Sequence, residues 1–167
     1  MRPEDLASAL VDGGLDREYV VETVVESFRD TVSEDEVIAV VDRLVTERDA
    51  EQAGWPDSGP VLDALAALSD KGIVMRADFT CCGSCGAAEI GAEAGDDDRG
   101  YVFFHHQDTE IAATGGGLML SYGTFDGTDP TVVGREVVEA VVAAGAEVKW
   151  NGSASRFIHV TPLRWRR

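Results

Sequence analysis

The chain has 167 residues and a formal net charge of -17, from 31 acidic and 14 basic residues. Its length fits one compact domain with a small appendage, since domains typically have about 100 to 200 residues. The charge argues against a nucleic-acid or anionic-membrane binder, because a polyanionic partner requires a basic surface. At 44% hydrophobic residues the chain can form a core, and it lacks the roughly 20-residue apolar run of a membrane helix. We therefore expect a soluble, cytoplasmic protein.

Most of the negative charge lies in residues 1–70, which contain 18 acidic residues and 5 arginines. Residues 71–167 contain 13 acidic and 9 basic residues. We interpret the acidic N-terminal part as a solvated helical surface, and alternatively as a docking face for a basic protein partner. No particular oligomeric state is indicated.

The hydrophobic pattern of the first 70 residues predicts helices. Apolar residues, mostly valines, recur at a spacing of three or four over 16–30 and again over 34–48. Ser33 and Glu36 form a capping box that opens the second of these helices. A segment rich in glycine and proline, residues 54–60, ends it.

A third helix is expected to begin with Pro60 as its first residue and to end at Gly72. After this helix the spacing of apolar residues changes from that of helices to that of strands. The chain is therefore divided into an acidic helical region (1–53), a linker with a helix (54–72) and an α+β domain (73–167).

Alternating apolar residues predict strands in the remaining chain. The expected strands are 73–79, 101–106, 118–122, 147–150 and 156–160, the last two forming a hairpin across Asn151-Gly152.

Two helices are expected between these strands. One begins after Asp129 with Pro130 and ends at Gly145, and a weaker one covers 84–94. The order of elements predicts a ferredoxin-like antiparallel sheet of four or five strands with two helices on one face. We expect the N-terminal helical region to pack on this sheet.

All three cysteines lie in the segment Thr80-Cys-Cys-Gly-Ser-Cys-Gly86. The spacing of Cys82 and Cys85 is that of two thiolate ligands of one transition metal ion, zinc first among them. It is also the spacing of a redox dithiol at the start of a helix, whose N-terminus stabilises a thiolate. A third interpretation is purely structural, since cysteine packs well in cores. The spacing does not distinguish between the metal-binding, redox and structural interpretations.

A zinc site needs three or four protein ligands, and the nearest further candidates are Cys81, His105 and His106. Adjacent side chains of a strand point to opposite faces, so only one of the two histidines can face the cysteines. The predicted site is therefore Cys82, Cys85 and one histidine, with Cys81 as an alternative ligand.

The acidic residues that follow the histidines have two interpretations. Asp108 is expected to cap a short helix that begins at Thr109. Alternatively, Asp108 or Glu110 orients a histidine for acid/base chemistry.

Several stretches of the chain resemble an uncharacterised, mainly actinobacterial family, the domain of unknown function 6891. They are Phe79-Thr-Cys-Cys-Gly-Ser-Cys-Gly-Ala-Ala-Glu-Ile-Gly, Gly100-Tyr-Val-Phe-Phe-His-His-Gln-Asp-Thr-Glu, Leu118-Met-Leu-Ser-Tyr-Gly, Val133-Gly-Arg-Glu-Val-Val and Trp150-Asn-Gly-Ser. The resemblance covers the chain from about residue 55 to its end, and the N-terminal helices match more loosely. It implies a bacterial origin and a shared fold, and no mechanism.

Three functions remain open from the sequence. The leading hypothesis is metal binding by the Cys82/Cys85 pair with a histidine, in a mainly structural role. The second is a thiol-dependent enzyme or redox protein in which Cys82 is the nucleophile and a histidine the base. The third is a non-catalytic interaction module that uses the acidic helices.

Overall fold

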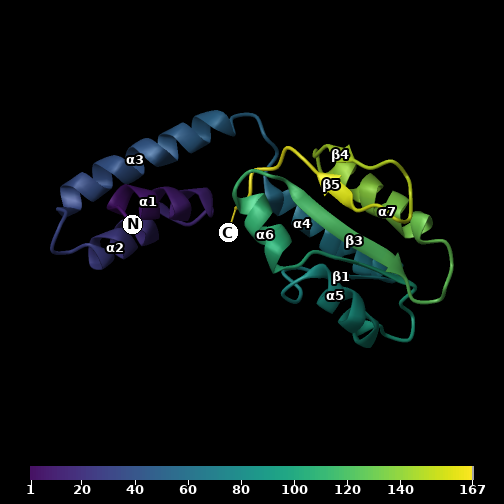
Figure 1. Ribbon diagram of the computed structural model, residues 1–167. Coiled ribbons are helices and arrows are strands. Elements are labelled where there is room, and N and C mark those ends of the chain that lie inside the picture. Colours follow the sequence, from purple (N-terminus) through teal and green to yellow (C-terminus); the bar gives the residue numbers. More distant parts are fainter. Residues whose placement is uncertain (167) are drawn as a thin grey trace.

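The computed structural model describes residues 1–166 and has two parts (Figure 1). Three helices come first, followed by a five-stranded mixed sheet with helices between its strands. The fold class is therefore α+β. None of the helices in the described residues is long and apolar enough to cross a membrane.

The N-terminal helices form a hydrophobic core of their own, dominated by valines. They are α1 (Pro3–Asp12), α2 (Arg17–Ser27) and α3 (Glu34–Glu51). The predicted capping box of Ser33 and Glu36 is present at the start of α3. In Figure 1 these helices lie beside one end of the sheet rather than on its face. Because valine has a modest helix propensity, packing between the three helices stabilises them.

The sheet has the strand order β1-β2-β3-β5-β4. Its strands are β1 (Ile73–Arg76), β2 (Gly100–Phe103), β3 (Leu118–Thr124), β4 (Val148–Lys149) and β5 (Ile158–Val160). Strands β1 and β2 are parallel, and the other neighbouring pairs are antiparallel.

Helices connect most of the strands. They are α4 (Ser58–Ala66), the 3-10 helix η1 (Ala67–Lys71), α5 (Gly83–Glu89), the 3-10 helix η2 (Ile90–Glu93), α6 (His106–Ala113) and α7 (Pro130–Ala143). Asp129 caps α7 and Pro130 is its first residue, as predicted. The prediction for α4 was off by two residues, because Asp57 occupies the N-cap position and Pro60 is the third residue of the helix.

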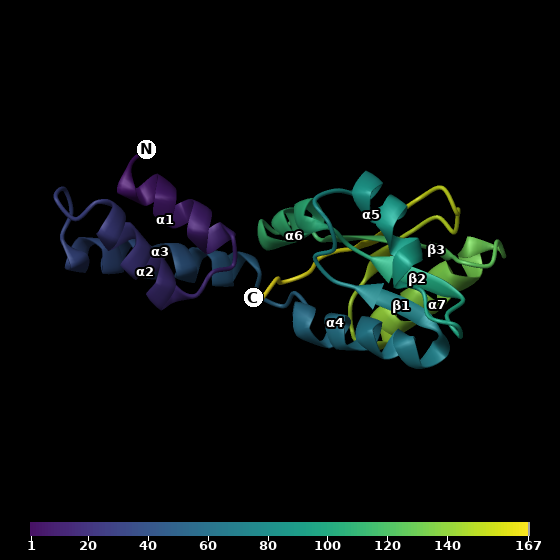
Figure 2. The ribbon, with the colours of Figure 1, turned by 90° about the horizontal axis from the view of Figure 1, so that it is seen from below.

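Helices cover both faces of the sheet, with α4 and α7 on one side and α5 on the other (Figure 2). Successive side chains of β2 point to opposite faces of the sheet, so the contacts of β2 show which helix lies on which face. Val133 of α7 lies where a side chain at Gly100 would project. Phe103, three residues along the strand and on the opposite face, packs against Gly86 of α5. The expectation that both helices share one face is therefore wrong.

Two further expectations about the sheet are corrected. The ferredoxin-like antiparallel arrangement is not confirmed, because β1 and β2 run parallel through a crossover that contains α5. The two-residue hairpin at Asn151-Gly152 does not form, since Lys149 pairs with His159 and leaves residues 150–157 as a loop.

The contact between α5 and the sheet depends on a glycine. A Cβ atom at Gly86 would lie 2.4 Å from Cε2 of Phe103, which is itself buried. We expect Gly86→Ala to lower the free energy of unfolding by about 1 to 3 kcal/mol, because the ring or the helix must move. The matched control is Gly91→Ala in η2, where nothing lies within 4 Å of the added carbon. Urea unfolding of both variants measures the difference, and equal stabilities would contradict the tight contact.

Candidate functional site

The segment between β1 and α5 has an unusual backbone. Asp78 and Thr80 have φ angles of 51° and 62°, in the left-handed region that non-glycine residues rarely adopt. Each such residue costs on the order of 1 kcal/mol or more and persists only where its surroundings hold it. Two of them flanking Phe79 bend the chain just before the cysteines.

Backbone hydrogen bonds to the segment after β2 hold this bend in place. The N–H of Phe79 donates to the carbonyl of Phe104 at 2.8 Å, and the N–H of His106 donates to the carbonyl of Thr80 at 3.1 Å. The Thr80 hydroxyl in turn donates to the carbonyl of Cys82 at 2.9 Å. These hydrogen bonds therefore position the cysteine turn, defined here as residues 80–85.

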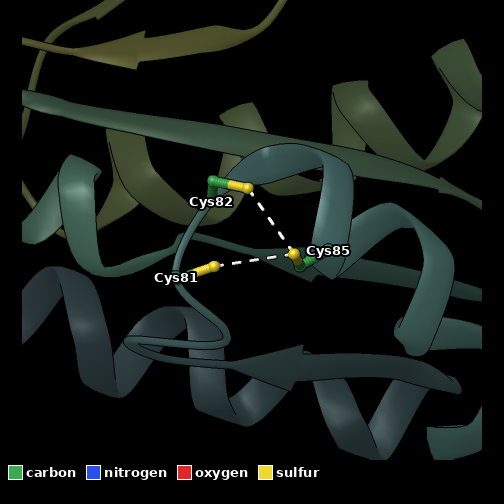
Figure 3. A group of neighbouring side chains, drawn as sticks. All are labelled: Cys81, Cys82 and Cys85. Carbon is green, nitrogen blue, oxygen red and sulfur yellow. Dashed lines mark hydrogen bonds between the residues drawn. The ribbon is translucent and has the colours of Figure 1, made fainter.

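The three cysteine side chains converge within this turn (Figure 3). The Sγ atom of Cys85 lies 3.5 Å from Sγ of Cys81 and 3.6 Å from Sγ of Cys82, and all three sulfur atoms lie within 4.8 Å of one another. All three are free thiols. Cys81 is exposed, whereas Cys82 and Cys85 are half-buried.

The thiols of Cys82 and Cys85 have pKa values shifted in opposite directions. Backbone N–H groups, that of Cys85 first, hydrogen-bond to the Cys82 sulfur and lower the pKa of that thiol below its usual value. Hydrogen bonds of the Cys85 thiol with the sulfurs of Cys81 and Cys82 favour its protonated form and raise its pKa to about 11. The cluster therefore contains one activated thiol beside one that stays protonated at neutral pH.

The predicted strand 101–106 is too long, because β2 ends at Phe103 and His105 is the N-cap of α6. His105 lies beside the cysteine turn, with its Nε2 3.5 Å from the point where a Cβ at Gly83 would lie. Its Nδ1 accepts the backbone N–H of Asp108 at 3.3 Å, and its Nε2 lies 3.1 Å from Oδ2 of the same residue. Burial raises the pKa of the Asp108 carboxyl. The expected helix cap is corrected, because His105 is the N-cap and Asp108 is the third residue of the helix.

His106 lies in the first turn of α6 and is exposed. Its Nδ1 is 2.7 Å from Oδ1 of Asp78, which also accepts a hydrogen bond from the Thr109 hydroxyl at 2.8 Å. Glu110 lies on the exposed side of the helix. Both histidines are thus paired with carboxylates in the described residues.

Among the described residues, the group of His, Cys, Asp and Glu atoms close enough to share a metal ion consists of the three cysteines. This cluster can hold a metal ion. The sulfur of Cys81 is as close to that of Cys85 as the sulfur of Cys82 is, although the sequence suggested Cys81 only as an alternative ligand. The participation of a histidine stays a prediction.

Cys82 also lies at the edge of an open cleft of about 590 Å³. Tyr101, Arg156 and Phe157 line this cleft, and sequence reasoning did not identify them. Arg156 and Phe157 belong to the loop that replaces the expected hairpin turn, so no local pattern places them near the cysteines.

Comparison with known proteins identifies the family. A family described as "domain of unknown function (DUF6891)" matches residues 3–167, so the chain belongs to it and the match includes the N-terminal helices. No curated protein and no solved structure gives a significant match.

The different protonation of the cysteines predicts an order of alkylation. At about pH 7 we expect iodoacetamide to modify Cys82 faster than Cys85, because the thiolate is the reactive form. Both are half-buried, so accessibility favours neither. Fragment mass spectrometry of the peptide that contains all three residues measures the rates. Faster modification of Cys85 would contradict the hydrogen-bond pattern of the turn.

Proposed function

We propose that this member of the DUF6891 family binds one transition metal ion, zinc, through the thiolates of Cys81, Cys82 and Cys85. The observation that carries the proposal is the convergence of three free cysteine sulfurs within 4.8 Å in a single turn.

The spacing of the sulfurs supports tetrahedral coordination. With zinc–sulfur bonds of about 2.3 Å, the sulfurs of a tetrahedral site lie about 3.8 Å apart. The separations of 3.5 Å and 3.6 Å from Cys85 to its two neighbours are close to this edge. Little rearrangement of the turn is needed for the three sulfurs to bind one ion.

The electrostatics of the turn also favour a cation. Zinc binds thiolates, and the backbone N–H groups that hydrogen-bond to Cys82 stabilise its ionised form. Cys85 retains its proton first because hydrogen bonds with the sulfurs of Cys81 and Cys82 favour the protonated thiol, and second because those sulfurs oppose a further negative charge. A divalent ion that takes the place of this proton compensates the repulsion between the thiolates.

A site of three cysteines connects different segments of the chain from those that the predicted Cys82, Cys85 and histidine site would connect. All three ligands lie within five consecutive residues, so the ion connects the end of the bent segment to the first turn of α5. The turn is joined to the segment after β2 by backbone hydrogen bonds and not by the proposed ligands. Three protein ligands leave one coordination position open, which is the pattern of sites that bind an exchangeable ligand.

The unequal pKa values favour thiol–disulfide exchange as a second function. The Cys82 thiolate would attack a substrate disulfide, form a mixed disulfide and release one substrate thiol. The Cys85 sulfur, 3.6 Å away, would then attack Cys82 and release the second thiol. The protein would be oxidised to a Cys82–Cys85 disulfide and the substrate disulfide reduced to two thiols. Cys81 has no required role in this exchange.

Zinc titration of single variants tests the metal site. We expect wild-type protein, produced without an affinity tag, to bind one zinc ion. Cys81→Ser, Cys82→Ser and Cys85→Ser should each weaken binding about a hundredfold, by analogy with structural zinc sites, in which four protein ligands share a binding free energy of about 10 to 16 kcal/mol. Competition with a chromophoric chelator gives the affinities.

Two variants serve as controls in this titration. Ser84→Ala changes an exposed residue of the same turn and should leave the affinity unchanged. His106→Gln should do the same if the ligands are the three thiolates. Absence of stoichiometric zinc binding by the wild type would overturn the proposal. Unchanged binding by Cys81→Ser alone would overturn the three-thiolate set.

The affinity for zinc should depend on pH. Because the pKa of Cys85 is raised to about 11, zinc must displace its proton throughout the neutral range. The apparent affinity should therefore rise about tenfold per pH unit for each displaced proton between about pH 6 and pH 8. Calorimetry in buffers of different ionisation enthalpy counts the released protons. Binding that is independent of pH would show that Cys85 is not a ligand.

A further inference from the structure

The aromatic cleft next to Cys82 is the uncovered part of the sheet face that α5 partly covers. It is lined by Cys82, Gly83, Ser84, Ala87, Tyr101, Phe103, Gln107, Ser121, Tyr122, Ala154, Ser155, Arg156 and Phe157. Its volume of about 590 Å³ lies within the range of about 300 to 1,000 Å³ typical of small-molecule sites.

We propose that this cleft binds a small ligand that carries an aromatic ring and a carboxylate. The proposal does not depend on the metal site, because the groups that would hold the ligand belong to β2 and to the loop over residues 153–157.

The floor of the cleft is aromatic. The rings of Tyr101 and Phe103 stack along β2 with centroids 6.0 Å apart and an interplanar angle of 27°. The Tyr101 ring extends across Gly123 of β3, where an added Cβ would lie 2.4 Å from the phenol oxygen. The absence of a side chain at Gly123 thus lets the Tyr101 ring lie against the sheet, as a platform for another ring.

The opposite wall is a loop that the core holds in place. The hydroxyl of Tyr122 lies 2.8 Å from the carbonyl oxygen of Ser153 and 3.0 Å from that of Arg156, and it accepts the indole N–H of Trp150 at 3.0 Å. These contacts fix the loop without using the side chains of Arg156 and Phe157. Phe157 is 58% exposed, which is high for a phenyl ring.

The lining of the cleft is positively charged, whereas the protein as a whole is negatively charged. Among the residues that the structure describes, none of those lining the cleft carries a carboxylate, although the chain has 31 acidic residues. Arg156 forms no ion pair within the described residues, whereas nine other arginines do. A guanidinium without a partner beside aromatic rings matches a carboxylate in charge and shape.

A second polar group of the cleft also lacks a partner. The Tyr101 hydroxyl makes no hydrogen bond within the described residues, while that of Tyr122 makes several. Tyr101 therefore offers a donor from the floor, and Arg156 offers donors and a positive charge from the wall. One guanidinium balances the single charge of a carboxylate, whereas a doubly charged phosphate ordinarily needs more.

Binding of benzoate by the metal-free full-length protein tests the proposal. We expect amide chemical-shift changes in a two-dimensional ¹H–¹⁵N spectrum to concentrate in β2 and the loop over 153–157. Arg156→Gln should weaken benzoate binding about tenfold and Tyr101→Phe about fivefold, as expected for a charged and a neutral hydrogen bond. The matched control is Arg135→Gln, which removes another arginine that has no ion pair in the described residues and lies on α7, outside the cleft lining.

Three other probes define the ligand class. Benzamide keeps the ring without the charge and should bind at least about tenfold more weakly than benzoate. Acetate keeps the charge without the ring and should produce no saturable shifts. Equal binding of benzamide, or an unchanged affinity in Arg156→Gln, would overturn the role of the carboxylate. Tighter binding of phenyl phosphate than of benzoate would overturn the choice of a carboxylate over a phosphate.

Discussion

The parallel pairing of β1 with β2 determines where everything else in the site lies. Two parallel strands place their carboxyl ends at the same edge of a sheet, so the segments that follow them are neighbours. The cysteine turn follows β1 and the histidine segment follows β2. Backbone hydrogen bonds from Phe79 and His106 continue the pairing beyond the strands. This continuation holds the left-handed conformations of Asp78 and Thr80, which in turn bring the three sulfurs together.

Local signals in the sequence predicted local structure well. Ser33 with Glu36, and Asp129 with Pro130, act within one helical turn, and the structure confirms both caps. The parallel pairing was not predictable in this way, because alternation along a strand identifies its faces and not its partners or their direction. The Asn151-Gly152 pair likewise favoured a tight turn, but the register of β4 and β5 and the anchoring by Tyr122 kept a longer loop.

In the candidate site, too, the features that depend on neighbouring residues were predictable and those that depend on distant residues were not. The three cysteines were identifiable because they lie almost next to one another in the chain. Cys81 was expected only as an alternative ligand, because its position beside Cys85 depends on left-handed conformations at Asp78 and Thr80, two residues that are not glycine. No sequence pattern pointed to Arg156, because its proposed role depends on the lack of an ion-pair partner among the described residues and on the rings of Tyr101 and Phe103, which are distant in the chain.

The acidic character of the chain does not prevent a negatively charged ligand from reaching the cleft. Most of the charge belongs to the N-terminal helices, which lie beside one end of the sheet and contribute no residue to the lining (Figure 1). At physiological ionic strength, exposed charges more than about 8 Å away are largely screened. Charged groups near the ligand therefore decide its affinity, and Arg156 is the charged side chain among the lining residues. The distant acidic residues affect the rate of encounter more than the affinity, and this effect weakens as salt is added.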